Sequence, residues 1–271
     1  TMNFITAIVL LFIIGLCYGS TDQSSVIGSV SEGTPAYNAG LKENDTIIEC
    51  NGYKIKTWDK LTIVTNLKNK NDYYEYKIKH EDGSIDTYKI VPDKYAVFDG
   101  KTIKIDETNT LESILKEYDK KEKDVTISNL VGIQAKSKVN KGFVSAIKYA
   151  FSKFGSIVST MILIIGSLFT GKLGLSALSG PVGMYSVVGT VASLGFANII
   201  YLTAYLSINL GVLNILPFPA FDGGRVLFVL IEAVTRKKVD PKIEGYFHTV
   251  GFALIMLLMI YITFQDVLRL F

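Results

Sequence analysis

The sequence predicts an α-helical polytopic membrane protein with one polar α+β domain inserted between its membrane segments. Hydrophobic residues make up 49% of the 271 residues, and the mean hydropathy is +0.32, which is high for a soluble chain. Most of the Lys, Asp and Glu fall in residues 21–142, whereas the sequence on both sides is apolar. The net charge of +3 is too small to indicate a nucleic-acid partner.

The first apolar segment, residues 1–20, is predicted to be a transmembrane helix. Met2 to Gly19 is long enough to cross a bilayer, which takes roughly 20 apolar residues. Neither Lys nor Arg precedes it and no Ala-x-Ala site follows it, so it is not typical of a cleaved signal peptide. The two cysteines, Cys17 and Cys50, imply no disulfide framework.

Residues 143–178 are predicted to form an interfacial or membrane helix. Their apolar stretch from Phe154 to Phe169 is short for a span and contains several Ser and Thr residues, but a true span stays open. Two further spans are predicted in residues 179–271. The first runs from Phe196 to Leu216 and continues after a break, and the last runs from Phe247 to Phe264.

The orientation follows from a short basic loop between the last two apolar segments, Arg236-Lys-Lys238 with Lys242. Short loops rich in Lys and Arg stay in the cytoplasm, whereas long domains are translocated largely regardless of charge. Residues 20–142 are therefore predicted to be extracytoplasmic, in a multi-pass protein of the plasma membrane.

A carboxylate lies in an unusual setting at Asn214-Ile-Leu-Pro-Phe-Pro-Ala-Phe-Asp222-Gly-Gly224. An ionised group inside an apolar run is costly and marks a functional site by default. Two prolines and two glycines break the helix here, and broken backbone at membrane depth is tolerated only where it lines a cavity or is buried in protein. A metal ion is the simplest compensation for Asp222, because carboxylate oxygen is a zinc ligand.

This stretch resembles the Asn-x-x-Pro-x-Pro-x-Leu-Asp-Gly motif of the site-2 proteases, zinc metalloproteases that cut peptide bonds inside membranes. Asn214, Pro217, Pro219 and Asp222 fall in register, with Phe221 in place of leucine. The resemblance implies a Zn²⁺ cofactor with Asp222 as one ligand. It also implies that Asn214 holds substrate or the developing oxyanion, while Pro217 and Pro219 fix an irregular backbone beside the substrate.

Two other segments extend the resemblance to the regulator of sigma-E protease (RseP) group. Ser179-Gly-Pro-Val-Gly183 is similar to its Ser-Gly-Pro element, and Thr1-Met-Asn-Phe4 to the start of its second transmembrane helix. The His-Glu-x-x-His helix of the family, which supplies two zinc ligands and the general base, is absent from this chain. We therefore expect an N-terminally truncated fragment that binds zinc weakly and is inactive alone.

The two histidines do not replace that motif. His80 lies in a polar hairpin and His248 near the start of the last helix. Zinc sites need clustered ligands, so both are interpreted as surface or interfacial residues rather than as metal ligands.

Residues 25–92 resemble a PDZ-like domain. Thr34-Pro-Ala36, Ala39-Gly-Leu41 and Asn44-Asp-Thr-Ile47 follow the PDZ pattern, with Asn44 at a position where glycine is usual. Asparagine tolerates a left-handed backbone, so the turn is expected to be kept. PDZ domains bind an extended peptide as an added strand. The resemblance therefore implies substrate gating, which we assign to the predicted strand residues Ile27, Gly28, Ser29 and Val30.

Residues 93–142 form an extracytoplasmic segment whose fold the sequence leaves undecided. Asn109 is expected to cap a short helix with an apolar face. The charged run Lys116–Asp124 is interpreted as a solvated face.

The resemblance implies a single-span transmembrane protein as substrate, of the anti-sigma factor or signal-peptide class, besides the surrounding membrane lipid. A different class stays open: a membrane-anchored PDZ scaffold or pseudoprotease that binds without cutting. A transporter with a broken helix is less consistent with the sequence, since the Asn214–Gly224 segment is not repeated.

The predicted orientation can be tested by cysteine labelling. A membrane-impermeant thiol reagent added outside intact cells should modify Ser84→Cys and leave Lys237→Cys unmodified, because the second lies in the basic loop. Labelling of position 237 alone would invert the topology.

Overall fold

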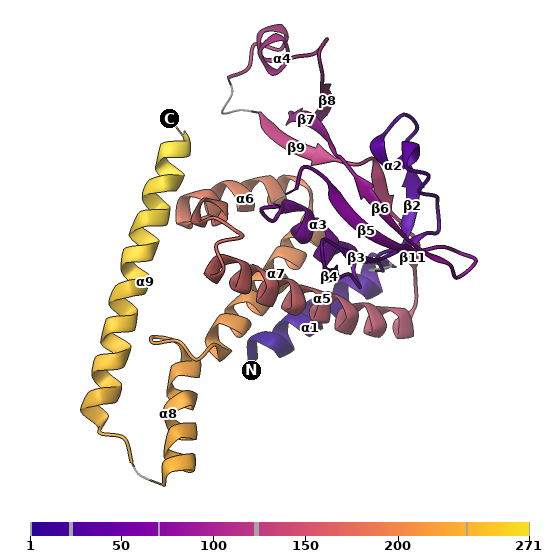
Figure 1. Cartoon of the computed structure of the whole chain (residues 1–271). Helices are drawn as coiled ribbons and strands as arrows, with labels where there is room; N and C mark the ends of the chain where they lie inside the picture. The colour runs from indigo at the N-terminus through magenta and orange to yellow at the C-terminus, as the bar shows by residue number, and fades with distance from the viewer. Residues whose placement is uncertain (1, 22–23, 70, 122–124, 237, 271) are drawn as a thin grey trace. The chain divides into compact units, whose positions relative to one another are not determined.

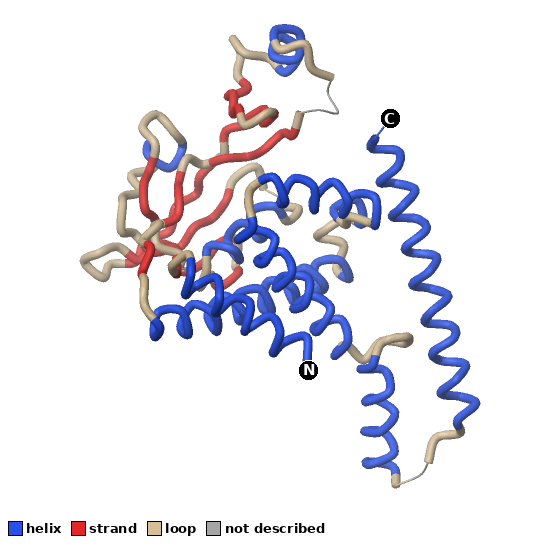
Figure 2. The backbone as a smooth tube through the Cα atoms, turned by 180° about the vertical axis from the view of Figure 1, so that it is seen from behind, coloured by secondary structure: helices blue, strands red, loops and turns tan. Residues whose placement is uncertain are grey.

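The computed structural model describes residues 2–21, 24–69, 71–121, 125–236 and 238–270. Three residues named above, Thr1, Asp124 and Lys237, lie outside these ranges. The chain forms two compact units, one made of Thr1–Thr21 with Val139–Phe271 and the other of Asp22–Lys138. Figure 1 and Figure 2 show the elements of both units from opposite sides.

The first unit is helical. Its helices are α1 (Met2–Cys17), α5 (Phe143–Phe169), α6 (Pro181–Ser193), α7 (Phe196–Ile215), α8 (Asp222–Thr235) and α9 (Pro241–Leu270), with a short 3-10 helix η2 at Leu175–Ala177. By length and composition, α5, α7 and α9 could each cross a membrane, whereas α1 has only 16 residues. Helices α5, α7 and α9 therefore agree with the membrane segments expected in residues 143–271, and α9 begins at Pro241, earlier than the predicted Phe247.

Helix α5 accommodates a buried charged residue. The helix begins at Phe143, and its amino-terminal half carries Lys153, whose side chain is buried. The Nζ atom of Lys153 lies 5.4 Å from the ring centroid of Tyr201 on α7. A cation over an aromatic face is stabilised by the ring quadrupole. This tertiary contact helps the apolar helix to accommodate a buried charge.

Helices α1, α5 and α7 share the hydrophobic core of this unit, built around Leu11, Tyr149 and Ile208. Two glycines permit their close approach. A Cβ atom on Gly15 would lie 3.1 Å from the Ala146 Cα atom of α5, and one on Gly211 would lie 2.3 Å from the Phe4 ring of α1. The three helices therefore pack too closely at these points for a larger side chain.

The two ends of the inserted unit lie side by side. Strand β1 (Ser20–Thr21) follows α1 and pairs antiparallel with β11 (Val139–Asn140), which leads into α5. The Ser20 hydroxyl donates to the Asn140 carbonyl at 2.9 Å. An insertion closed at its base in this way does not require the helices on either side of it to separate.

The second unit begins with a four-stranded sheet of order β4-β3-β5-β6. Its first elements are β2 (Ile27–Val30), α2 (Pro35–Asn38), β3 (Thr46–Cys50), β4 (Tyr53–Lys54), α3 (Trp58–Asn66), β5 (Tyr74–Lys79) and β6 (Ile85–Ile90). Alternate residues of β5 are buried, as the period-2 pattern predicts. Asn44 has a φ of 71°, which confirms the left-handed turn expected there.

Residues 93–142, left undecided above, add a second sheet and then return to the first part of the unit. Strands β7 (Asp93–Phe98), β8 (Lys101–Ile105) and β9 (Thr126–Leu130) form a sheet of order β8-β7-β9, and α4 (Leu111–Glu117) packs on it through Ile114. Strand β10 (Ile133–Ala135) then pairs antiparallel with β2.

The expected cap of α4 was wrong by one residue. The capping side chain is Thr110, whose Oγ1 atom accepts a hydrogen bond from the Ser113 amide, and not Asn109. Both residue types can satisfy an unpaired amide at a helix start, so composition alone did not choose between neighbours. The charged run that follows is described only as far as Lys121.

Both cysteines are free thiols. Cys50 is fully buried in β3, and burial raises the pKa of its thiol to about 12 because the thiolate would lose its hydration. A cysteine reacts as the thiolate, so the buried Cys50 contributes to packing rather than to chemistry.

The glycine contact between α1 and α7 gives a stability prediction. Gly211→Ala should lower stability in detergent by about 1–3 kcal/mol, the usual range for overpacking, because its Cβ atom would overlap the Phe4 ring. Gly155→Ala on α5 is the matched control, since nothing lies within 4 Å of its added Cβ atom. Thermal unfolding measures both. Equal stability of the two variants would contradict the packing described.

Candidate functional site

The predicted site lies at a break between two helices. Helix α7 ends at Ile215, one residue after Asn214, and α8 begins at Asp222. Pro217 and Pro219 occupy the connection, where neither can donate a backbone hydrogen bond or continue the helix. We call residues 216–221 the break loop. The structure thus places the four sequence-predicted site residues on the break loop and on the two helix ends that flank it.

The break loop satisfies part of its backbone by local turns. The Phe218 amide donates to the Leu216 carbonyl at 2.7 Å, and the Phe221 amide donates to the Phe218 carbonyl at 3.3 Å. The Gly224 amide donates to the Phe221 carbonyl at 3.0 Å and so closes the first turn of α8. These turns matter because unpaired backbone groups are costly in an apolar surrounding.

The fold requires glycine at positions 223 and 224 for steric reasons. A Cβ atom on Gly223 would lie 2.2 Å from the Leu216 carbonyl oxygen, and one on Gly224 would lie 2.7 Å from the Phe218 carbonyl oxygen. Any larger residue would force α8 away from the end of α7. The two glycines therefore let the second helix start directly against the carbonyl end of the first.

The predicted site residues differ in exposure. Asp222 and Pro217 are exposed, whereas Asn214 and Pro219 are partly buried. Asp222 is the first residue of α8, and the residue before it, Phe221, has no polar side chain to cap the helix. A carboxylate in the first helical turn is favoured by the positive end of the helix dipole. The start of α8 thus presents one exposed carboxylate directly after the break loop.

Helix α9 packs directly on the break loop. The Ala220 amide donates to Nδ1 of His248 at 3.2 Å, and a Cβ atom on Gly251 would lie only 1.8 Å from the Cβ atom of Pro219. His248 is therefore partly buried, with 22% of its side chain exposed, and it contacts the loop of the predicted site. Sequence reasoning missed this contact, because nothing local to His248 shows that it meets a loop about 28 residues earlier in the chain.

The Ser-Gly-Pro element is held by the far part of the same helix. Helix α6 begins at Pro181, and the Gly183 amide donates to the Oδ2 atom of Asp266 on α9 at 2.8 Å. Asp266 is 3% exposed. Its carboxylate lies at the amino-terminal end of α6, where a negative charge is favourable.

A zinc site needs donor side chains that converge on one point. Among the residues that the structure describes, no three His, Cys, Asp or Glu side chains converge on one point. A catalytic zinc site has three protein ligands and an open position. Asp222 has the chemistry of one such ligand, so this chain fits a zinc site as one contributor and not as the complete set.

The second unit contains a cavity of about 530 Å³ beside α3. Trp58, Leu61 and Thr65 of α3 line one part of it, and Ile133 and Gln134 of β10 line another. In the sheet of β10 and β2, the other edge of β10 is unpaired among the described residues.

The four β2 residues predicted for gating are not in that lining. Ile27–Val30 pair instead with β10 through Val30↔Ile133, Ser29↔Gln134 and Ile27↔Ala135. Sequence reasoning missed β10 because its partner strand lies about a hundred residues earlier in the chain, and only folding brings the two together.

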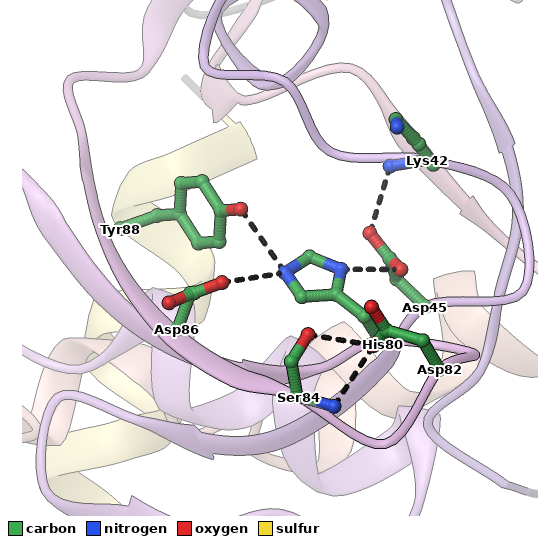
Figure 3. Close-up of polar contacts among 7 residues, drawn as sticks. All are labelled: Lys42, Asp45, His80, Asp82, Ser84, Asp86 and Tyr88. Carbon is green, nitrogen blue, oxygen red and sulfur yellow. Dashed lines mark hydrogen bonds and ion pairs between the residues drawn. The ribbon is translucent and has the colours of Figure 1, made fainter.

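His80 belongs to a hydrogen-bonded cluster shown in Figure 3. Its Nδ1 atom lies 2.7 Å from Asp45, and its Nε2 atom lies 3.1 Å from the Tyr88 hydroxyl and 3.4 Å from Asp86. The Lys42 amide donates to the same Asp45 carboxylate. The His80 side chain is 17% exposed, so this polar hairpin residue is held mainly by its hydrogen-bond partners. The cluster ties the β5–β6 hairpin to the turn before β3.

These features define a class of protein: a membrane-compatible helical unit with a broken helix that presents a carboxylate, and an inserted α+β unit. The chain belongs to peptidase family M50, whose family model matches residues 1–258. It is 35% identical to zinc metalloprotease RasP of Oceanobacillus iheyensis, over 100% of this chain and 58% of that protein. It is also 35% identical to the regulator of sigma-W protease RasP of Bacillus subtilis, over 100% of this chain and 57% of that protein.

The chain thus spans less than two thirds of the length of these two relatives. The resemblance to the site-2 proteases noted in the sequence is confirmed at the level of the family. The Oceanobacillus iheyensis relative is named a zinc metalloprotease, which agrees with the expected cofactor.

The contact of α9 with the break loop can be tested at Gly251. Gly251→Ala should separate α9 from Pro219, because the added Cβ atom has no room, and should raise the rate of chymotrypsin cleavage after Phe221 several-fold in detergent. The matched control is Gly245→Ala on the same helix, where nothing lies within 4 Å of the added atom. Unchanged cleavage of the Gly251 variant would show that the loop does not depend on α9.

Proposed function

We propose that this chain forms the part of a zinc-dependent intramembrane endopeptidase that carries the aspartate ligand and the substrate-facing asparagine. The observation that carries the proposal is the helix break itself, with Asn214 on one side and Asp222 at the helix start on the other. Membership of peptidase family M50 supports the same reaction. The two histidine ligands and the general base would come from a His-Glu-x-x-His helix, which is not among these 271 residues.

In this proposal Asp222 is the metal ligand contributed by the chain. A bound zinc ion would lower the pKa of its water to about 7 and polarise the scissile carbonyl. Asp222 is the first residue of α8, and metal binding would require its carboxylate to be ionised. Its exposure leaves the side chain open to a metal held by residues of another helix.

Asn214 is proposed to bind the substrate or the developing oxyanion through its side-chain amide. It is the penultimate residue of α7 and partly buried, so its position is set by a regular helix. Pro217 and Pro219 keep the following backbone irregular, and carbonyl groups that no helix uses can then face an extended substrate strand.

The proposed substrates are single-span membrane proteins, of the anti-sigma factor or signal-peptide class. The Bacillus subtilis relative is called a regulator of sigma-W protease, and this name supports a membrane-bound regulator of a sigma factor as the natural substrate. The protein is proposed to be a multi-pass protein of the plasma membrane with residues 20–142 extracytoplasmic. The three membrane-compatible helices support this arrangement.

The second unit is proposed to gate substrates as a PDZ-like domain. A peptide would add as a strand to the unpaired edge of β10, across the cavity from α3, rather than to β2. The backbone edge would supply the hydrogen bonds, and Trp58 and Leu61 would contact apolar side chains.

The central assignment is tested in a protein that joins this chain to a His-Glu-x-x-His helix. Asp222→Asn should lower zinc content and remove most cleavage of a transmembrane substrate, because an amide is a poor zinc ligand of similar volume. Asn214→Ala should keep zinc but lose turnover by an amount comparable to one oxyanion-hole donor, about 2.7–4 kcal/mol.

Zinc analysis and cleavage rates on the same preparations separate the two roles. Stoichiometric zinc and near-normal cleavage by the Asp222 variant would reject the assignment. Binding of substrate without cleavage by the unmodified protein would favour the scaffold or pseudoprotease instead.

A further inference from the structure

The break loop contains one backbone conformation that local sequence does not explain. Ala220 has a φ of 76°, in the left-handed region that residues other than glycine rarely adopt. Such a conformation persists only where surrounding contacts impose it, and it is common at functional sites. Ala220 lies two residues before Asp222, so whatever imposes its conformation also sets the start of α8.

The contact that meets Ala220 comes from α9. Its amide donates to Nδ1 of His248 at 3.2 Å. Nδ1 can accept only when it carries no proton, so this contact requires the tautomer with the proton on Nε2. Nε2 is buried and lies 3.9 Å from the Glu244 carboxylate one turn earlier on α9.

The imidazole ring itself is held in place. The ring of Phe228 on α8 lies 6.3 Å from it and the ring of Phe247 on α9 lies 6.0 Å from it, centroid to centroid. One turn further along α9, Gly251 abuts Pro219. Two neighbouring residues of the break loop, Pro219 and Ala220, are thus held by Gly251 and His248 of α9.

We propose that His248 is a positioning residue for Asp222: by accepting the Ala220 amide hydrogen bond, it fixes the break loop and thereby the direction of the metal-binding carboxylate. The inference rests on the proposed role of Asp222 as a ligand. His248 does not touch the metal or the substrate in this account. It acts through the backbone of the loop, and it satisfies an amide that would otherwise be costly to bury.

The competing explanation is that the ring only fills space, and two substitutions separate the explanations. In His248→Asn the side-chain oxygen takes the place of Nδ1, so an acceptor for Ala220 is kept although volume is lost. In His248→Gln the oxygen takes the place of Nε2, so volume is better kept but the acceptor is misplaced. Thr249→Ala is the control, since its hydroxyl donates to Gly245 within α9 itself.

The first experiment is amide hydrogen exchange on the 271-residue chain in detergent, read over residues 216–224. We expect His248→Gln to raise the exchange rate of this segment at least tenfold, and His248→Asn and Thr249→Ala to stay within threefold of the unchanged protein. Exchange in α1 and α7 should be the same in all four and serves as the check of folding. Equal exchange of the Asn and Gln variants would overturn the proposal.

If the Gln variant does not fold, the Asn variant decides alone. Exchange in the loop like that of the unchanged protein supports the acceptor role, and raised exchange overturns it. This measurement needs neither zinc nor activity, so its outcome is independent of the proposed function.

The second experiment uses the protein that joins this chain to a His-Glu-x-x-His helix. His248→Gln should lower kcat at least tenfold with KM within twofold, and His248→Asn should restore kcat to within threefold, because positioning of Asp222 affects turnover more than substrate binding. Failure of Asn to restore kcat would overturn the positioning role. A fully active Asp222→Asn protein would instead reject the proposed function and leave the exchange result on His248 standing.

Discussion

The helix break between α7 and α8 is the constraint on which the rest of the helical unit depends. A chain that interrupts a helix among apolar residues must satisfy the freed amide and carbonyl groups without water. The break loop does so by short turns at Phe218 and Phe221 and by the contact of Ala220 with His248. The exposed carboxylate of Asp222 is a consequence of this arrangement, since α8 can begin there only because the preceding loop is held.

Helix α9 supports both irregular segments of this unit. Near its start, His248 and Gly251 meet the break loop, and near its end Asp266 accepts from the Gly183 amide at the start of α6. A Cβ atom on Gly180 would lie 2.9 Å from the Asp266 carboxylate, so the Ser-Gly-Pro element needs a small residue where it approaches α9. One continuous helix therefore sets the positions of two segments that are separated by α7 in the sequence.

The inserted unit is joined to the helices by the β1–β11 pair, which brings its two ends together. It has its own buried residues, among them Ile47, Tyr76 and Ile78. Some of its strands pair with partners that lie far away in the sequence. Pairing of β10 with β2 is the clearest case, because it creates the wall opposite α3 in the cavity. The last strand of the unit, β10, can thus complete a surface whose recognisable sequence pattern lies in the first strand, β2.

The sequence by itself determined the helical membrane architecture, the polar insertion and the break at Asn214–Gly224, because apolar length, charge segregation and the residues that end helices are local properties. Local turn chemistry was equally readable, as at Asn44, whereas the choice between Asn109 and Thr110 as a cap was not. The tertiary structure alone decided that His248 meets Ala220, that Lys153 is accommodated by Tyr201 and that β10 completes the cavity. These contacts join residues far apart in the chain, and no periodicity or spacing encodes which distant partners will meet.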